Sequence, residues 1–539
     1  MNFDYLQYRY PSRRSVIFGK KGMVCTSQPL AAQAGLDTLK KGGNVVDAII
    51  TTATCMTVLE PTSNGLGSDA FALYWDAKTQ KLYGLNGSGF APAALTPEAM
   101  QAKGYTAMPD RGWASVTIPG APSAWAELHK RFGKMAFADC LEPAINYAEN
   151  GFPLQPVVGQ LWEEAVETFA PYKDKPEFQP FFATFMKNGN PTVGSLVKLP
   201  DQAKTLRELA ATQCESYYRG AIAQAFAKFA KETGGYITAE DLAKYRAEWV
   251  EPIHTDYHGY TICEIPPNGQ GLVVLMTLNI MDKLALQKAD HDDIATIHKQ
   301  IEAMKQAFID GMTYISDAHS MKQMSVEHLL SDTYAEERAK EITDTALMPK
   351  PSNPFCGGTV YLCAADEEGN MISYIQSNYK GFGSGIVIPG YGIALNDRAC
   401  GFSLNSHSDD YLVPGKKPYH TIIPGFLMKE GKAVGPFGVM GAYMQPQGQV
   451  QVLMNMIDFG MNPQEALDAP RWQWLGGKKI EIEPDFGPHL AEALRKRGHQ
   501  VAIQPDFIGF GRGQIILRDE NGVLTGATEP RADGCVAAW

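Results

Sequence analysis

The sequence predicts a large α+β protein, from its composition and from a change of pattern along the chain. The 539 residues are 45% hydrophobic and 20% charged, which is typical of a globular protein with a deep core. Before about residue 352 the patterns are mainly helical, whereas from residue 359 short apolar runs bounded by turn residues indicate strands. This length allows one large domain or two.

The N-terminal part is predicted to be helical, with one β-hairpin near its start. Its expected helices end at Gly or before Pro, which are common helix boundaries. They are residues 30–41, 45–58 and 121–132 and most of the segment 140–352, and the hairpin is 71–83. A loop at 61–67 separates the second helix from the hairpin.

The pattern changes near residue 353. Pro351, Pro354, Gly357 and Gly358 form a punctuated linker, after which the apolar and partly β-branched residues 359–365 indicate a strand. The further strands expected are 371–376, 385–388 and 433–439, and the helices expected are 448–457 and 463–467.

Charge, cysteine content and hydropathy narrow the class of protein. The formal net charge of -11 argues against a nucleic-acid partner, because phosphate binding draws on clustered Lys and Arg. The nine cysteines are widely spread without a C-x-x-C pair, so we expect reduced thiols. The N-terminus lacks the apolar segment of a secretion signal, and no apolar run is long enough to span a bilayer. We therefore expect a cytoplasmic protein, not bound to a membrane, that acts on a small molecule.

Two histidines raise the question of a metal site. His254 and His258 would lie on one face of a helix, but the strand-like segment that follows them argues against that helix. We expect no metal and no organic cofactor.

Thr359 stands at the start of a predicted strand, directly after Gly357 and Gly358. A Thr in this place can act as a nucleophile whose own amino group becomes the general base once the preceding bond is cut. Glycine would tolerate a strained backbone before the cut, and it leaves the Gly358 carbonyl open to attack. On these residues alone, the commoner interpretation is a structural Thr that enters a strand.

A series of sequence motifs is spread over nearly the whole chain. The first part carries GGNVVDA (42–48), EPTSNGLGSDAF (60–71), IPGAPSAW (118–125) and PPNGQG (266–271). The second part carries TVYLCAADEEGN from Thr359, FGSGI (382–386), GIALND (392–397), PGKKPYHTIIP (414–424), IDFGMNPQEALDAPRW (457–472) and GATEPRADG (526–534). Each motif is weak alone, but their common order resembles the γ-glutamyltransferase (γ-glutamyltranspeptidase) family.

This resemblance implies the four-layer αββα fold of the N-terminal-nucleophile hydrolases, with two antiparallel sheets between helical layers. It also implies autoproteolysis between Gly358 and Thr359, into a large subunit of residues 1–358 and a small subunit of residues 359–539. The two fragments would form one αββα domain as a heterodimer, and a higher oligomer is left open.

The resemblance also implies the catalytic residues. The family's nucleophile falls on Thr359, and the hydroxyl that supports it falls on Ser377, where the family has Thr. The oxyanion donors fall on the main-chain N–H groups of Gly441 and Ala442. Ala in place of the usual second Gly is tolerable, because main-chain donors need no particular side chain. The alternative interpretation of these two residues is an ordinary strand-to-helix turn.

The residues that bind a γ-glutamyl group in the family are changed here. The family's carboxylate-binding Arg and Ser-Ser pair align with Pro97 and His420-Thr421, and its ammonium-binding residues align with Tyr379, Arg398 and Gly401. A cation at Arg398 would repel a substrate ammonium, whereas Arg binds a carboxylate through two hydrogen bonds. Alternatively, Arg398 pairs with Asp397 or Asp409. The candidate substrate-binding residues are Tyr379, Arg398, His420 and Thr421.

The stretch between Phe402 and His420 is shorter than in the family's transpeptidases, where a lid loop covers the donor. An open site admits water and favours hydrolysis of the acyl-enzyme over transfer to an amine. We therefore expect an autoprocessed amide hydrolase or acyltransferase that favours hydrolysis. The alternatives left open are a true γ-glutamyl transpeptidase or glutathione hydrolase, an oxamate amidohydrolase or a glutaryl or cephalosporin acylase, and a non-catalytic protein that binds a small acid.

Overall fold

Two seven-stranded antiparallel sheets lie face to face in the centre of the molecule. The computed structural model describes residues 14–187, 189–284, 286, 290–349 and 358–539. The first sheet has the order β21 (Cys535–Ala538), β2 (Gly22–Thr26), β10 (Gly358–Asp366), β11 (Met371–Tyr379), β3 (Asp69–Asp76), β4 (Lys81–Gly87) and β7 (Glu248–Val250). The second has the order β1 (Ile17–Gly19), β20 (Leu524–Thr528), β19 (Arg512–Arg518), β15 (Lys432–Met440), β14 (Gly425–Lys429), β9 (Tyr260–Glu264) and β8 (Ile253–Tyr257).

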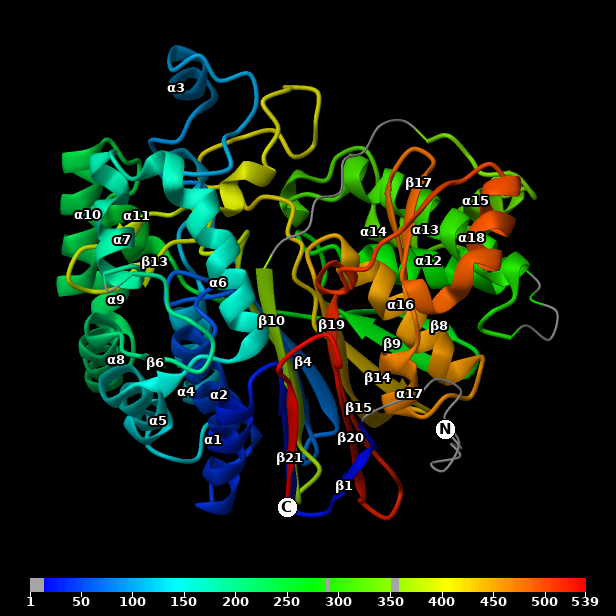
Figure 1. Ribbon diagram of the computed structural model, residues 1–539, viewed down its shortest axis with the longest axis horizontal. Coiled ribbons are helices and arrows are strands. Elements are labelled where there is room, and N and C mark those ends of the chain that lie inside the picture. The colour runs from blue at the N-terminus through cyan, green and yellow to red at the C-terminus, as the bar shows by residue number, and fades with distance from the viewer. Residues whose placement is uncertain (1–13, 188, 285, 287–289, 350–357) are drawn as a thin grey trace.

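Helices cover the outer face of each sheet, so the molecule has four layers (Figure 1). The layer over the first sheet includes α1 (Pro29–Lys40), α2 (Val45–Leu59), α4 (Ala121–Phe132), α5 (Phe137–Asn150), α6 (Pro156–Phe169), α8 (Pro200–Thr212) and α10 (Ala221–Thr233). The layer over the second sheet includes α12 (Gly271–Lys283), α13 (Ile294–Tyr314), α16 (Met444–Ile457), α17 (Pro463–Asp468) and α18 (Gly487–Lys496). This confirms the predicted αββα fold.

Each central strand divides its side chains between two cores, because successive strand residues point to opposite faces. On β10, Tyr361 and Cys363 pack between the two sheets, whereas Val360 and Leu362 pack under the helices of the first layer. The same alternation on β11 and β3 places odd-numbered residues between the sheets. Thr359, the predicted nucleophile, is the first odd-numbered residue of β10 and therefore lies at one end of the space between the sheets.

Both sides of the predicted cleavage junction contribute strands to both sheets. The first sheet combines β2, β3, β4 and β7 from before residue 358 with β10, β11 and β21. The second combines β1, β8 and β9 with four strands from the later part. If the chain is cut at Thr359, the fragments stay joined by strand pairing and by shared cores.

The predicted elements of the N-terminal part and around Thr359 are confirmed, with three differences. The N-terminal helices, the hairpin β3–β4 and the pair β10–β11 lie where expected. Five strands interrupt the segment that was expected to be mainly helical. They are the two-residue strands β5 (Phe152–Pro153) and β6 (Leu196–Val197), and β7, β8 and β9, of which β8 carries His254. The strand predicted at 385–388 is only β12 (Val387–Ile388), and α16 begins at Met444, earlier than expected. Gly448 does not begin this helix; a Cβ there would lie 2.7 Å from Val439 Cγ1, so packing against β15 requires glycine.

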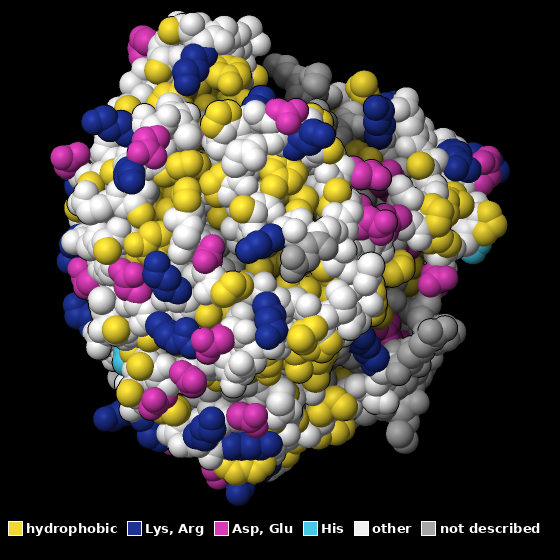
Figure 2. Space-filling view, turned by 60° about the vertical axis from the view of Figure 1, so that its left-hand side comes forward, with side chains coloured by type: hydrophobic (Ala, Val, Ile, Leu, Met, Phe, Trp, Pro, Cys, Tyr) yellow, Lys and Arg dark blue, Asp and Glu magenta, His cyan; other side chains and the backbone are white. Residues whose placement is uncertain are grey.

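The outer surface over the first layer carries basic and acidic side chains interspersed (Figure 2). Among the described residues, no helix is both long and apolar enough to cross a membrane.

Candidate active site

Thr359 lies next to the carbonyl group that its hydroxyl would attack. Its Oγ1 is 2.8 Å from the Gly358 carbonyl oxygen and 3.0 Å from Ser377 Oγ. Ser377 Oγ also lies 2.8 Å from the Gly358 oxygen and accepts a 2.7 Å hydrogen bond from the Tyr379 N–H. When Thr359 donates to Ser377, the Ser377 proton is free to bind and polarise the Gly358 carbonyl. Autoproteolysis requires the Thr359 oxygen to attack the carbon of this polarised carbonyl.

Strand pairing explains why these groups meet. Gly358 pairs with Tyr379 across β10 and β11, and the register shifts between Gly358 and Val360. Such a bulge re-aims a side chain and is common beside active sites. Ser377 in turn pairs with Asp69 on β3, so three polar side chains meet at one end of the inter-sheet space.

The main chain around Gly358 leaves little room for a side chain at this residue. A Cβ at this residue would lie 3.1 Å from Ser63 Cα and 3.2 Å from the Thr62 carbonyl oxygen. Its φ is not in the left-handed region, so the expected backbone strain does not apply to the described junction. Gly357 lies outside the described residues. The close approach of the main chain around Thr62 is therefore the structural reason for glycine at 358.

Gly441 and Ala442 form the turn between β15 and α16. Their φ values are +140° and +50°, and the Ala442 carbonyl accepts a 2.8 Å hydrogen bond from Gln270 Nε2. Neither N–H donates to another main-chain group in the described part of the chain. They also lie just before the N-terminus of α16, where the helix dipole favours negative charge. The turn thus has the properties of an oxyanion site, which stays a prediction for these two residues.

Arg398 is buried next to Ser377, the residue whose hydroxyl Thr359 contacts. Its side chain, 1% exposed, donates to Thr421 Oγ1 at 2.7 Å and approaches Ser377 Oγ at 3.4 Å. The guanidinium stacks on the Tyr379 ring at 4.2 Å, and its Nε has no hydrogen-bond partner among the described residues. Asp397 instead lies 3.7 Å from Arg111. The expected alternative of an ion pair with Asp397 or Asp409 is absent from the described part of the chain, so Arg398 keeps a donor available.

His420 contacts a carboxylate that the sequence analysis did not identify. Its Nε2 is 3.0 Å from Asp69 Oδ2, and its Nδ1 accepts from the Ile422 N–H at 3.4 Å. Burial and then Arg398 keep the pKa of His420 well below its ordinary value, so the ring is neutral and donates to Asp69. Burial raises the pKa of Asp69 to about 7. The sequence could have indicated this contact, because Asp69 is a carboxylate at an odd-numbered position of an otherwise apolar strand. Odd-numbered residues of this strand face the same side of the sheet as Ser377.

An open cavity of about 370 Å³ adjoins the junction. It is lined by Gly358 and Gly441, by residues of α6 and by Arg111 and Arg512. The predicted substrate-binding residues Tyr379, Arg398, His420 and Thr421 are buried and do not belong to its described lining. Gly358, the neighbour of Thr359, therefore borders an open cavity, whereas Ser377, which Thr359 contacts, and Arg398 are buried.

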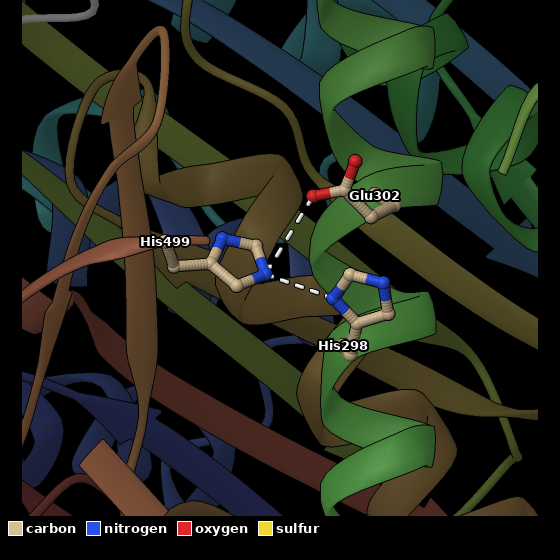
Figure 3. A group of neighbouring side chains, drawn as sticks. All are labelled: His298, Glu302 and His499. Atoms are coloured by element: carbon tan, nitrogen blue, oxygen red, sulfur yellow. Dashed lines mark hydrogen bonds and ion pairs between the residues drawn. The ribbon is translucent and has the colours of Figure 1, made fainter. Parts of the chain in front are cut away.

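One cluster of described residues has the chemistry of metal ligands, and it lies in the helical layer over the second sheet, away from Thr359. His298 and Glu302 on α13 face His499, which follows α18 (Figure 3). His298 Nδ1 and His499 Nε2 are 2.8 Å apart, a hydrogen-bond distance, and Glu302 binds Lys305 Nζ at 2.7 Å. These contacts make the cluster a buried hydrogen-bonded link between segments on either side of the cleavage junction.

This link is expected to weaken in acid. Burial, followed by Lys305, lowers the pKa of His499 from 6.5 to about 3, and burial lowers that of His298. Because the folded protein binds these protons more weakly than the unfolded chain, the stabilisation is present above pH 6.5 and is lost as pH falls toward 3. The slope is at most about 1.4 kcal/mol per pH unit for one histidine.

Thermal unfolding of the processed protein between pH 7 and pH 4 tests this prediction. His499→Gln should flatten the fall of the melting temperature with acidification, whereas His254→Gln, at an exposed histidine on β8, should not. Equal slopes in the His499→Gln variant and the unmodified protein would contradict it.

Comparisons with known proteins cover almost the whole chain. The family description "Gamma-glutamyltranspeptidase" matches residues 31–539. The chain is 34% identical to the glutathione hydrolase-like YwrD proenzyme of Bacillus subtilis, over 96% of this chain and 98% of that protein. It is 33% identical to the oxamate amidohydrolase proenzyme of Klebsiella pneumoniae, with the same two coverages. A crystal structure of a cephalosporin acylase from Bacillus halodurans superposes with a TM-score of 0.94, at 56% identity over 100% of this chain and 99% of that one. The chain therefore belongs to the gamma-glutamyltranspeptidase family, whose members are N-terminal threonine amidohydrolases made as proenzymes.

Proposed function

We propose that this enzyme cuts itself before Thr359 and then hydrolyses small amides whose acyl half carries a carboxylate. The observation that carries this proposal is the buried Arg398, which contacts Ser377 and Thr421 and keeps a free Nε donor. An Arg in a closed site binds a carboxylate strongly and repels an ammonium group. The changed residues at Tyr379 and His420-Thr421 support the same reading.

The chemistry follows from the groups around Thr359. After cleavage, its free amino group accepts the hydroxyl proton while Oγ1 forms an ester bond to the substrate carbonyl carbon. The N–H groups of Gly441 and Ala442 would stabilise the oxyanion, and Ser377 would orient the nucleophile. The C–N bond then breaks, the amine leaves with the proton, and water hydrolyses the ester by the reverse proton route.

A panel of acyl groups tests the proposal. Oxamate and glutaryl amides are expected to be turned over better than γ-glutamyl-p-nitroanilide and glutathione. The kcat/KM difference should be about tenfold or more, because each missing charge-assisted contact costs about 1.5 to 3 kcal/mol. The names of relatives include glutathione hydrolase, oxamate amidohydrolase and acylase, so the panel also separates these activities. A clear preference for γ-glutamyl compounds would restore an ordinary γ-glutamyl enzyme.

Hydrolysis is expected to dominate over transfer. The described lining of the open cavity includes no residue of 402–420, the stretch that corresponds to the family's lid. This stretch is instead held against the body of the protein, where the Asp409 carbonyl accepts from Ser316 Oγ at 2.8 Å and the Lys417 N–H donates to Asp317 Oδ2 at 3.0 Å. Water therefore has access to the acyl-enzyme.

Addition of glycylglycine as an acceptor should change the rate of amine release from an activated amide by less than about twofold. The reason is that no lid excludes water from the acyl-enzyme in favour of the acceptor. The measurement is initial rate against acceptor concentration, with product analysis for the acyl-dipeptide. Strong stimulation with formation of the acyl-dipeptide would show that transfer dominates.

A further inference from the structure

The open cavity is the side from which the amine half of a substrate must leave. In an acyl-enzyme mechanism the amine departs first, while the acyl group stays on Thr359. The acyl side is closed by buried groups, since Arg398 is 1% and Ser377 0% exposed. The cavity of about 370 Å³, lined by Gly358 and Gly441, is open. This assignment of the two sides rests on the proposed function.

Arg512 places a cationic donor in the wall of this cavity. It begins β19 and pairs with Met440, the residue before Gly441, so it lies beside the predicted oxyanion site. The residue is 4% exposed, and its Nε has no hydrogen-bond partner among the described residues. Its ion-pair contact with Glu60 is a long one, 3.4 Å from Nη1 to Oε1. Buried donors without partners are costly, which makes a ligand for this one favourable.

The partner of Arg512 compensates its charge weakly. Burial raises the pKa of Glu60, and this outweighs the lowering by Arg512 and by the hydroxyls of Ser27 and Ser63. Glu60 meets Arg512 at Nη1, at 3.4 Å, which leaves the Nε side of the guanidinium open to another anion. Glu164 and Asp506 also line the cavity, but both are exposed and are therefore screened by water and salt.

The rest of the wall fits a small organic anion. Thr62 Oγ1 is a second buried group in this lining without a hydrogen-bond partner in the described chain. Arg111 is already engaged by the carbonyl groups of Gly381 and Gly383 and by Asp397, so it is the less available cation. Leu161, Ala165, Met440 and Ile508 supply an apolar surface.

We propose that Arg512, with the Thr62 hydroxyl, binds a carboxylate on the amine half of the substrate. The enzyme would then release amino acids or similar amino carboxylates from N-acyl compounds. Arg398 would select the acyl half and Arg512 the amine half, on opposite sides of Thr359.

Matched substrate pairs test this proposal in the processed enzyme. One pair is an N-acyl-glycine against the N-acyl-glycinamide, and the other is an acyl-4-carboxyanilide against the acyl-anilide. Each pair is made with oxalyl, glutaryl and γ-glutamyl acyl groups, so the ratio within a pair is independent of which acyl group is accepted. We expect the carboxylate member to have a kcat/KM about tenfold or more higher in at least one pair.

Variants assign the effect to the residue. Arg512→Met should bring this ratio close to one while acyl preference is kept, and Arg512→Lys should retain part of it. Thr62→Val should lower the ratio more mildly, by about two- to fivefold. Arg398→Met is the matched control, because it should change acyl preference and leave the ratio within a pair unchanged.

The outcomes separate the two proposals. Ratios near one in the unmodified enzyme for both pairs would overturn the amine-half proposal, whatever the acyl preference. An unchanged ratio in Arg512→Met would also overturn it. A γ-glutamyl preference combined with a high carboxylate ratio would overturn only the acyl-half proposal.

Discussion

Thr359→Ala is expected to yield a single uncut, folded and inactive chain. The unmodified protein should instead run as two pieces, residues 1–358 and the remaining 181 of the 539, with Thr359 as the first residue of the smaller piece. The reason is that the proposed nucleophile for both the cut and turnover is the Thr359 hydroxyl, which lies 2.8 Å from the Gly358 oxygen. Activity should fall by about 10⁴-fold or more. A denaturing gel, N-terminal sequencing and an amidase assay measure the three effects.

Two further variants sharpen this prediction. Thr359→Ser keeps the hydroxyl and should cut and work more slowly. Ser377→Ala removes the group that polarises the Gly358 carbonyl and should slow processing, whereas Ser377→Thr should largely preserve it. Normal processing of the Thr359→Ala variant would remove this residue from the mechanism.

Arg398→Ala is expected to raise KM for an anionic acyl amide by about tenfold or more, while the chain is still cut at Thr359. Arg398 is buried beside Ser377, so water would screen its contact with a bound carboxylate very little. Loss of this charge-assisted contact should therefore weaken substrate binding. Processing should continue because the attack on Gly358 is intramolecular and uses Ser377. Completed processing also serves as the test that the variant folds.

A neutral acyl amide of the same size is the matched substrate for this variant. Its KM should change little, because it does not use the guanidinium. Arg398→Lys should lie between the two, since it keeps the charge and loses the planar pair of donors. An equal rise in KM for charged and neutral substrates would indicate a general structural role for Arg398.

Local sequence predicted those parts of the fold whose signals lie within one element. The N-terminal helices, the hairpin β3–β4 and the pair β10–β11 were identified because apolar periodicity and Gly or Pro boundaries are properties of neighbouring residues. The strand-like segment expected after His258 is β9, but strands β7 and β8 were not separated from the surrounding helices, because each lies at the edge of its sheet and carries a mixed pattern of exposure. The four-layer arrangement itself came from the resemblance to a family.

The sequence by itself, through its resemblance to the family, determined which residues are predicted as nucleophile, cleavage site and changed glutamyl-binding set, because these are statements about residue types at motif positions. Tertiary structure decided which charges are compensated. It joined His420 to Asp69, left Arg398 without the expected acidic partner and placed Arg512 beside Gly441. These facts depend on burial and on contacts between different elements, such as that of His420 with Asp69, which is 351 positions away. A cavity wall assembled from α6, β19 and the segment around Thr62 has no local signal, and only the packed sheets and helices bring its members together.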